Sequence, residues 1–170
     1  MSASTDLLID AFGRVRELVD EVVDGLGAEE LTTRLDPEAN SIAWLVWHLT
    51  RVQDDHVAGV AGSEQVWTSQ GWEERFALPF PAEAIGYGQS AEEVARVRGL
   101  TPEQLSGYHT AVHDRTVEYV RGLDDADLAE VIDRSWTPPV TRGARLVSVI
   151  GDDMQHAGQA AFIRGVLRRR

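Results

Sequence analysis

The feature that most limits the fold of this chain is the spacing of its apolar residues, which recur every three or four positions over four long stretches. These stretches are residues 5–25, 41–62, 101–122 and 144–168. Apolar side chains with this period share one face of an α-helix, so each stretch predicts a helix with a buried face. Four such helices in 170 residues predict an all-α fold, a four-helix bundle.

A long connection, residues 63–100, joins the second and third predicted helices. Connections of this length in compact domains are usually functional or cover a site. This one is rich in aromatic residues, which disordered segments lack, so we expect it to pack on the bundle. Trp67 and Trp72 are candidates to cover the mouth of a pocket, and Ser90 with Glu93 predicts a short helix. No repeat or linker divides the chain, which predicts a single domain over residues 1–170.

Composition excludes several classes of protein. No apolar run is long enough to span a membrane, and the N-terminal segment lacks the basic residues of a signal peptide, so we expect a cytoplasmic protein. The net charge of −12 disfavours nucleic-acid binding, which needs basic patches. There is no cysteine, so any metal must be held by His, Asp or Glu.

The last predicted helix contains the polar segment DDMQHAGQ, residues 152–159, between apolar flanks. Asp152 and His156 are four residues apart and therefore neighbours on one helix face. We expect them on the buried apolar stripe, between Val149 and Ile163, with Gln159 continuing the line. Two ligands at this spacing form half of a metal site.

The third ligand must come from another helix, and His48 lies on the buried stripe of the second. His48, Asp152 and His156 together would offer two imidazoles and a carboxylate, the donor set of catalytic zinc and of ferrous facial-triad sites. The pattern D-x-x-x-H is common by itself, and a single core histidine is more often hydrogen-bonded than bound to a metal. The structural interpretation therefore stays open beside the metal site.

A second histidine pair, His109 and His113 on the third helix, is a rival ligand set. We expect both to flank the apolar stripe, partly exposed, where they could line a pocket. Gly151, Gly158 and Gly165 recur every seven residues on the last helix and predict a tight helix contact, inside the bundle or between the subunits of a homodimer.

The segments NSIAWLVWHL and, about a hundred residues later, GDDMQHAGQAAFIRG resemble the DinB/YfiT-like superfamily of metal-binding four-helix bundles. That family carries a histidine late in the first segment and H-x-x-x-H-x-G-Q in the second. His48 matches the first histidine, and His156, Gly158 and Gln159 match the end of the second motif. The resemblance covers nearly the whole chain in helix order. It departs at Asp152, which replaces a histidine and leaves open whether the site is kept, altered or lost.

Within the superfamily, the sequence is most similar to the actinobacterial mycothiol transferases. This resemblance implies a divalent metal, with zinc first and iron, nickel or manganese as alternatives. It also implies a low-molecular-weight thiol, mycothiol, that attacks an electrophilic small molecule. Asp55 is a candidate to orient a ligand imidazole, and Tyr108 and Gln159 are candidates to bind substrate.

Two other functions remain open at this stage. A metal-dependent hydrolase would use the same three residues with a bound hydroxide in place of the thiol. A non-catalytic, stress-related binding bundle would follow if Asp152 abolishes metal binding. Thiol transfer ranks first, hydrolysis second and the non-catalytic bundle third.

Overall fold

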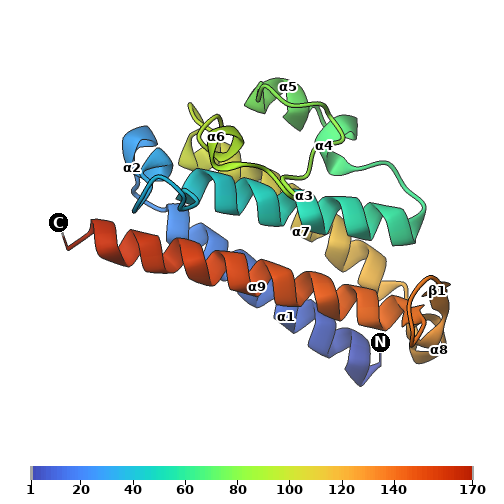
Figure 1. The fold of residues 1–170 in the computed structure, drawn as a ribbon. Helices are drawn as coiled ribbons and strands as arrows, with labels where there is room; N and C mark the ends of the chain where they lie inside the picture. The colour runs from blue at the N-terminus through green and yellow to red at the C-terminus, as the bar shows by residue number, and fades with distance from the viewer. Residues whose placement is uncertain (1, 170) are drawn as a thin grey trace.

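A computed structural model describes residues 2–169 and has four long helices at its centre (Figure 1). Their bounds are α1 Ala3–Val23, α3 Ile42–Ala61, α7 Pro102–Arg121 and α9 Arg142–Leu167. The all-α bundle predicted from the apolar spacing is therefore confirmed, with ends within a few residues of those expected. In the bundle α1 and α3 each pack against both α7 and α9.

Each long helix begins at a side-chain cap. Ser2, Ser41, Thr101 and Thr141 each accept a hydrogen bond from a backbone N–H in the first turn of their helix. Such caps satisfy a donor that the helix itself leaves unpaired, and each contributes about 1 kcal/mol to stability. Thr101 and Gln104 also form a capping box at the start of α7.

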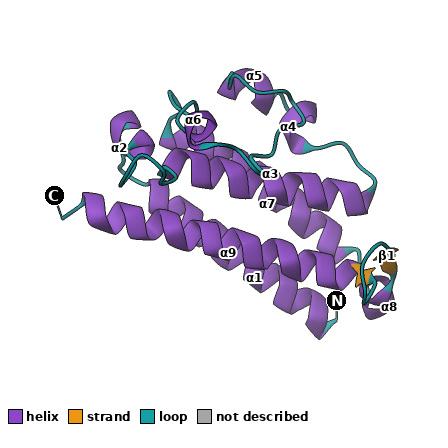
Figure 2. Ribbon diagram, in the orientation of Figure 1, coloured by secondary structure: helices purple, strands orange, loops and turns teal. Residues whose placement is uncertain are grey.

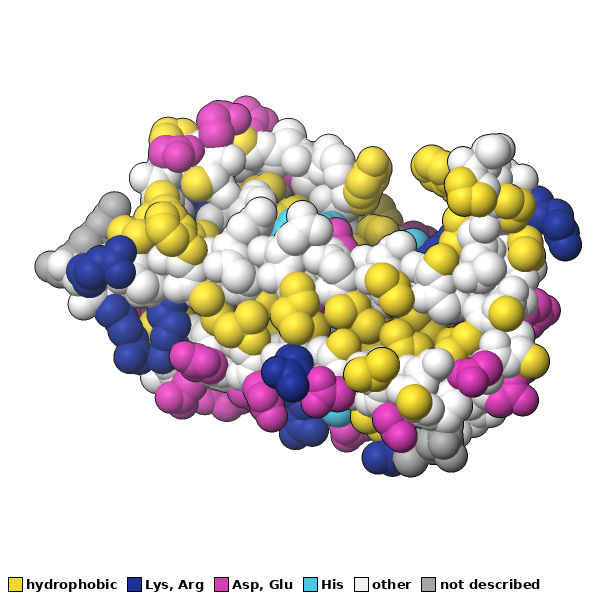
Figure 3. Space-filling model, turned by 90° about the horizontal axis from the view of Figure 1, so that it is seen from below, with side chains coloured by type: hydrophobic (Ala, Val, Ile, Leu, Met, Phe, Trp, Pro, Cys, Tyr) yellow, Lys and Arg dark blue, Asp and Glu magenta, His cyan; other side chains and the backbone are white. Residues whose placement is uncertain are grey.

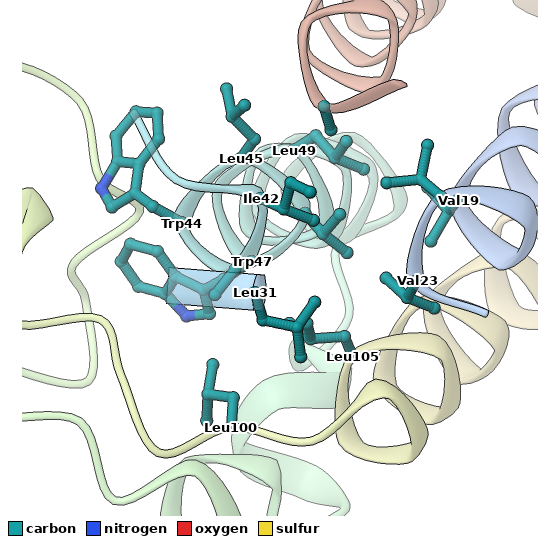
Figure 4. Close-up of a cluster of buried hydrophobic side chains, with 14 of the residues drawn as sticks. Val19, Val23, Leu31, Ile42, Trp44, Leu45, Trp47, Leu49, Leu100 and Leu105 are labelled. Atoms are coloured by element: carbon teal, nitrogen blue, oxygen red, sulfur yellow. The ribbon is translucent and has the colours of Figure 1, made fainter. Parts of the chain in front are cut away.

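The core forms where the apolar faces of the helices meet (Figure 4). Val19 and Val23 of α1 and Leu105 of α7 belong to the same buried cluster as Leu45 and Leu49 of α3. Every residue from Ser41 to Asp54 is buried, because α3 is covered by the other helices on one side and by the connection on the other. His48 lies in this segment.

The connection between α3 and α7 contains three short helices (Figure 2). They are α4 Val66–Ser69, α5 Trp72–Phe76 and α6 Ala91–Val94. Arg51 is fully buried and donates to the carbonyls of Ala82 and Ala84 in this connection. Asp54 accepts from the backbone N–H groups of Val66 and Trp67. These charge-assisted bonds fasten the connection to α3.

The remaining elements lie beyond the ends of the long helices. They are α2 Ala28–Thr32, α8 Asp125–Ala129, and the antiparallel strands β1 Val131–Asp133 and β2 Val140–Thr141. The acidic run at residues 124–130 begins α8, with Asp124 as its cap. The segment from β1 to β2 lies against the N-terminal end of α9 (Figure 1).

The surface over α1 and α9 carries a band of apolar side chains bordered by acidic and basic ones (Figure 3). Leu7 of α1 and Val147 and Phe162 of α9 are all more than half exposed. Within the described chain, nothing packs against Gly151 or Gly158, so the predicted tight contact is not made inside the bundle. No helix in residues 2–169 combines the length and the apolar character needed to cross a membrane.

Candidate metal centre

The structure brings His48 of α3 together with Asp152 and His156 of α9. One potential ligand atom from each residue lies within 4.8 Å of the other two. His156 Nε2 is 3.6 Å from Asp152 Oδ1, and the rings of His48 and His156 have centroids 4.9 Å apart. The juxtaposition expected from the sequence is therefore present, at the seam between α3 and α9.

The orientation of His48 is set by the connection between α5 and α6. Its Nδ1 lies 2.5 Å from the carbonyl oxygen of Ile85. A carbonyl only accepts hydrogen bonds, so Nδ1 carries the proton and Nε2 keeps the lone pair that a metal needs. The chain at Gly86 leaves no room for a side chain beside the same ring, since a Cβ there would lie 2.7 Å from His48 Nδ1.

The other two residues also present free donor atoms. His156 Nδ1 is 3.1 Å from Gln159 Oε1, which leaves its Nε2 lone pair directed toward Asp152. Asp152 Oδ2 is buried and has no hydrogen-bond partner among residues 2–169. An unpaired buried carboxylate oxygen is costly, and a cation would satisfy it. These three residues thus fit a divalent metal that prefers two nitrogens and one oxygen.

Trp44 forms one wall of this cluster. Its ring stacks on His48 at 4.5 Å and meets His156 edge-on at 6.3 Å. Its indole N–H donates to Gln89 Oε1 at 2.7 Å, which ties the wall to the connection. The ring shields one side of the imidazole pair from water.

Burial lowers the pKa of His48, and the neighbouring His156 acts in the same direction. The Ile85 carbonyl and Asp152 oppose this shift. The lowered pKa keeps the imidazole neutral, which is the form that binds a metal.

Between Val149 and Ile163, the buried stripe of α9 is displaced by one position from the predicted one. Its members are Leu146, Val149, Asp153, Ala157, Ala160 and Ile163. Asp152 and His156 lie at the edge of this stripe and are partly exposed, whereas Asp153 is fully buried with no partner for either carboxylate oxygen in the described chain. Desolvation raises the pKa of Asp153 well above its ordinary value, and Asp152 adds to the shift. The edge position gives solvent access to the three candidate metal ligands, His48, Asp152 and His156, which are called the metal cluster below.

The secondary candidates have different surroundings from those expected. Tyr108 is fully buried, donates to Asp54 and accepts from Arg51, so it belongs to the network that fastens the connection. Asp55 accepts from Gln65, while the Nδ1 proton of His48 goes to Ile85. Gln159 is exposed, and its Oε1 lies 3.1 Å from His156 Nδ1.

The rival histidine pair does not form a ligand set here. His109 is fully buried, against the expectation of partial exposure, and its Nδ1 contacts the hydroxyl of Thr50 at 3.2 Å. His113 contacts Asp114 instead. Trp67 and Trp72 pack against Tyr108 and do not cover the metal cluster.

A cavity of about 500 Å³ adjoins the cluster and includes His48 and Asp152 in its lining. Two exposed aromatic side chains, Tyr87 and Trp136, line it together with Arg145. Sequence analysis missed these three residues, because they come from three separate segments and share no motif. The arrangement of a three-residue donor set beside an open cavity is suited to binding a small molecule at a metal.

A family model described as the DinB superfamily matches residues 11–160. The chain belongs to the DinB superfamily. The crystal structure of a conserved protein from Enterococcus faecalis is similar over 100% of this chain and 99% of that one, with a TM-score of 0.92 and 35% sequence identity. No curated protein matches the chain. The family membership confirms the resemblance drawn from the two motifs.

Proposed function

We propose that this DinB superfamily member is a metal-dependent transferase, which activates a low-molecular-weight thiol for attack on an electrophilic small molecule. Mycothiol is the first candidate for the thiol, from the resemblance of the sequence to mycothiol transferases. The observation that carries the proposal is the placement of His48, Asp152 and His156 together, beside a cavity that His48 and Asp152 line, with Asp152 Oδ2 lacking a hydrogen-bond partner among residues 2–169.

Three residues would bind the metal, and two further groups orient the imidazoles. His48, Asp152 and His156 would hold the metal, with zinc expected first for this donor set. When bound, a divalent metal supplies a positive charge that lowers the pKa of a thiol. The Ile85 carbonyl and Gln159 hold the Nδ1 protons of the two imidazoles and so keep both rings in the ligand tautomer.

The absence of cysteine fits a reaction whose nucleophile arrives as a substrate. The cavity offers apolar walls from Val52 and Val149 next to the metal cluster. Such walls exclude water from a reacting sulfur and favour small organic electrophiles. Epoxides, activated alkenes and alkyl halides are the electrophile classes that a thiolate attacks.

The test begins with elemental analysis of protein purified without a chelating tag. Wild type is compared with His48→Ala and His156→Ala, and with His113→Ala as a control on a histidine outside the cluster. We expect about one divalent metal per chain in wild type and in the control, and little in the other two variants. Asp152→His, which restores the residue typical of the family motif, should also retain metal.

Thiol transfer is then measured with mycothiol and a chromogenic electrophile. Metal-dependent conjugation that is lost in His48→Ala would support the proposal. Ester turnover without added thiol would favour a hydrolase. An absence of metal in wild type, even after reconstitution, would refute both catalytic functions.

We also propose that two copies pair through the apolar band over α1 and α9. The exposed side chains of Leu7, Val147 and Phe162 and the open faces of Gly151 and Gly158 support this pairing. Sedimentation velocity at micromolar concentration would show a dimer, and a monomer at all concentrations would contradict it.

A further inference from the structure

The cavity beside the metal cluster runs along the seam between α3 and α9 and includes a second polar group of residues. His48 and Asp152 line one part, and His56 and Arg145 line another. Arg145 and Asp152 are seven residues apart on α9, so they share a face two turns apart, about 10 Å along the axis. His48 and His56 are eight apart on α3, about 12 Å by the same rise. The cavity thus has two polar groups separated by roughly two helical turns.

The guanidinium of Arg145 has more N–H donors than its two contacts use. Its Nη1 is 3.4 Å from His56 Nδ1, and its Nη2 is 3.4 Å from Asp133 Oδ2. Both contacts are long for hydrogen bonds, and a guanidinium has five N–H donors. No shorter partner for Arg145 occurs within residues 2–169. Its side chain is 25% exposed, so the unused donors are accessible from the cavity.

The neighbouring carboxylates are better satisfied than Arg145. Asp133 accepts from the backbone N–H and the hydroxyl of Ser135 at 2.9 and 2.6 Å. Asp55 accepts from Gln65 at 2.8 Å. Among the charged side chains Arg145, Asp55 and Asp133, Arg145 has no contact shorter than 3.4 Å, although Asp133 is its ion-pair partner.

His56 adds a donor without adding charge. Burial lowers its pKa, and the positive charge of Arg145 lowers it further, whereas Asp55 and Asp152 oppose the shift. The imidazole is therefore neutral near pH 7. Since Nδ1 accepts from Arg145, the proton of the ring is on Nε2.

Between the two polar groups the lining is apolar and aromatic apart from Ser148. Val52 and Val149 come from the two helices, and Tyr87 and Trp136 come from separate loops. Tyr87 is 90% exposed and Trp136 is 66% exposed, so neither is used to fill the core. Large aromatic side chains exposed at a cavity typically cover the apolar part of a ligand.

We propose that Arg145 and His56 form an anion subsite, which binds a carboxylate or phosphate group on a small molecule whose reacting atom lies at the metal cluster. The ligand is elongated, with an anionic end, an apolar middle and a reacting end about 10 Å from the anion. Either the thiol or the electrophile could carry this group. The inference rests on the proposed function only in placing the reacting atom at His48, Asp152 and His156.

The test uses cobalt-reconstituted protein, in which a bound thiolate gives a sulfur-to-cobalt absorption band. ω-Mercaptooctanoate and ω-mercaptooctanol have the same length and differ only in the carboxylate. An extended chain of eight carbons spans about 10 Å, which matches the separation of the two polar groups. We expect wild type to bind the acid roughly 10-fold more tightly than the alcohol. 4-Mercaptobutyrate and 4-mercaptobutanol, which are too short to reach Arg145 and do not form a small chelate ring with the metal, should show no such preference.

Arg145→Gln should abolish the preference for the long acid. Arg134→Gln is the matched control, because Arg134 is exposed, lies in the loop between β1 and β2, and does not line the cavity. Arg145→Lys, which keeps the charge without the planar fork, should retain part of the preference. Equal binding of acid and alcohol by wild type, or an undiminished preference in Arg145→Gln, would overturn the subsite.

A second titration separates the two proposals. Octanoate and octanol have no sulfur, so calorimetry with this pair reports the anion subsite without any thiol at the metal. Octanoate binding that depends on Arg145, with no absorption band from either thiol, would refute thiol activation and leave the subsite standing. Absorption bands from both thiols, without tighter binding of the acid, would support thiol activation and refute the anion subsite. Electrophiles with and without a carboxylate then show which substrate carries the anion.

Discussion

Gly86 is the position where one added methyl group would test how the connection between α5 and α6 holds His48. Its φ is +91°, a conformation that side chains with a Cβ rarely adopt, and a Cβ would lie 2.7 Å from His48 Nδ1 and 3.0 Å from the Trp47 ring. Gly88 has φ +72° with nothing within 4 Å of the same position. Gly86→Ala and Gly88→Ala therefore share the backbone strain, and only the first disturbs the imidazole.

The magnitudes follow from these two differences. Positive φ in alanine costs about 1–2 kcal/mol, which we expect as the whole effect of Gly88→Ala on the free energy of unfolding. Overpacking against two buried rings adds about 1–3 kcal/mol, so Gly86→Ala should lose about 2–5 kcal/mol. Displacing the ring from the Ile85 carbonyl should also weaken metal binding by roughly 10- to 100-fold.

The assays are urea unfolding of the metal-free protein and chelator competition for the metal. The two variants are compared with each other, in both free energy of unfolding and metal affinity, because both carry the same backbone strain. Equal metal affinity in Gly86→Ala and Gly88→Ala would refute the role of this segment in orienting His48.

Two further predictions concern buried polar groups outside the cluster. Arg51→Met leaves Asp54, which is buried and 3.7 Å away, without its cation. We expect the free energy of unfolding in urea to fall by about 3–5 kcal/mol and residues 77–90 to be cleaved faster by a protease. The exposed control Arg115→Met should lower the free energy of unfolding by less than about 1 kcal/mol. The pKa of His109 is lowered to about 3 by burial, then by His113 and Arg16. Below about pH 6.5, His109 is protonated in the unfolded chain but stays neutral in the folded chain. The free energy of unfolding therefore falls by about 1.4 kcal/mol for each pH unit toward pH 3. His109→Gln should remove that contribution, and the same acid dependence in both proteins would contradict it.

The four long helices were predictable because the signals that define them are local. An apolar period of three to four residues and a Ser or Thr cap act within a few turns of the chain, whatever surrounds them. The same locality made the pairing of Asp152 with His156 predictable, because residues four apart are neighbours on any helix. His48 could be added since it lies on the buried face of its own helix.

Helix rotation and loop contacts were not predictable in this way. Asp152 and Asp153 differ by about 100° around α9, and the packing of that helix against α1 and α3 decides which of them is buried. The period of the stripe alone left this choice open, and the sequence analysis placed the wrong acid on it. The carbonyl that orients His48 comes from Ile85, 37 residues away, and it carries no side-chain signal.

By itself, then, the sequence determined the helices, their starts and a donor set of two histidines and a carboxylate. Tertiary structure decided which atoms of that set are free, which acid lies in the core, and how Tyr87, Trp136 and Arg145 meet at one cavity. The physical reason is that periodicity and capping are properties of short segments. Orientation, burial and cavities depend on contacts between segments far apart in the chain.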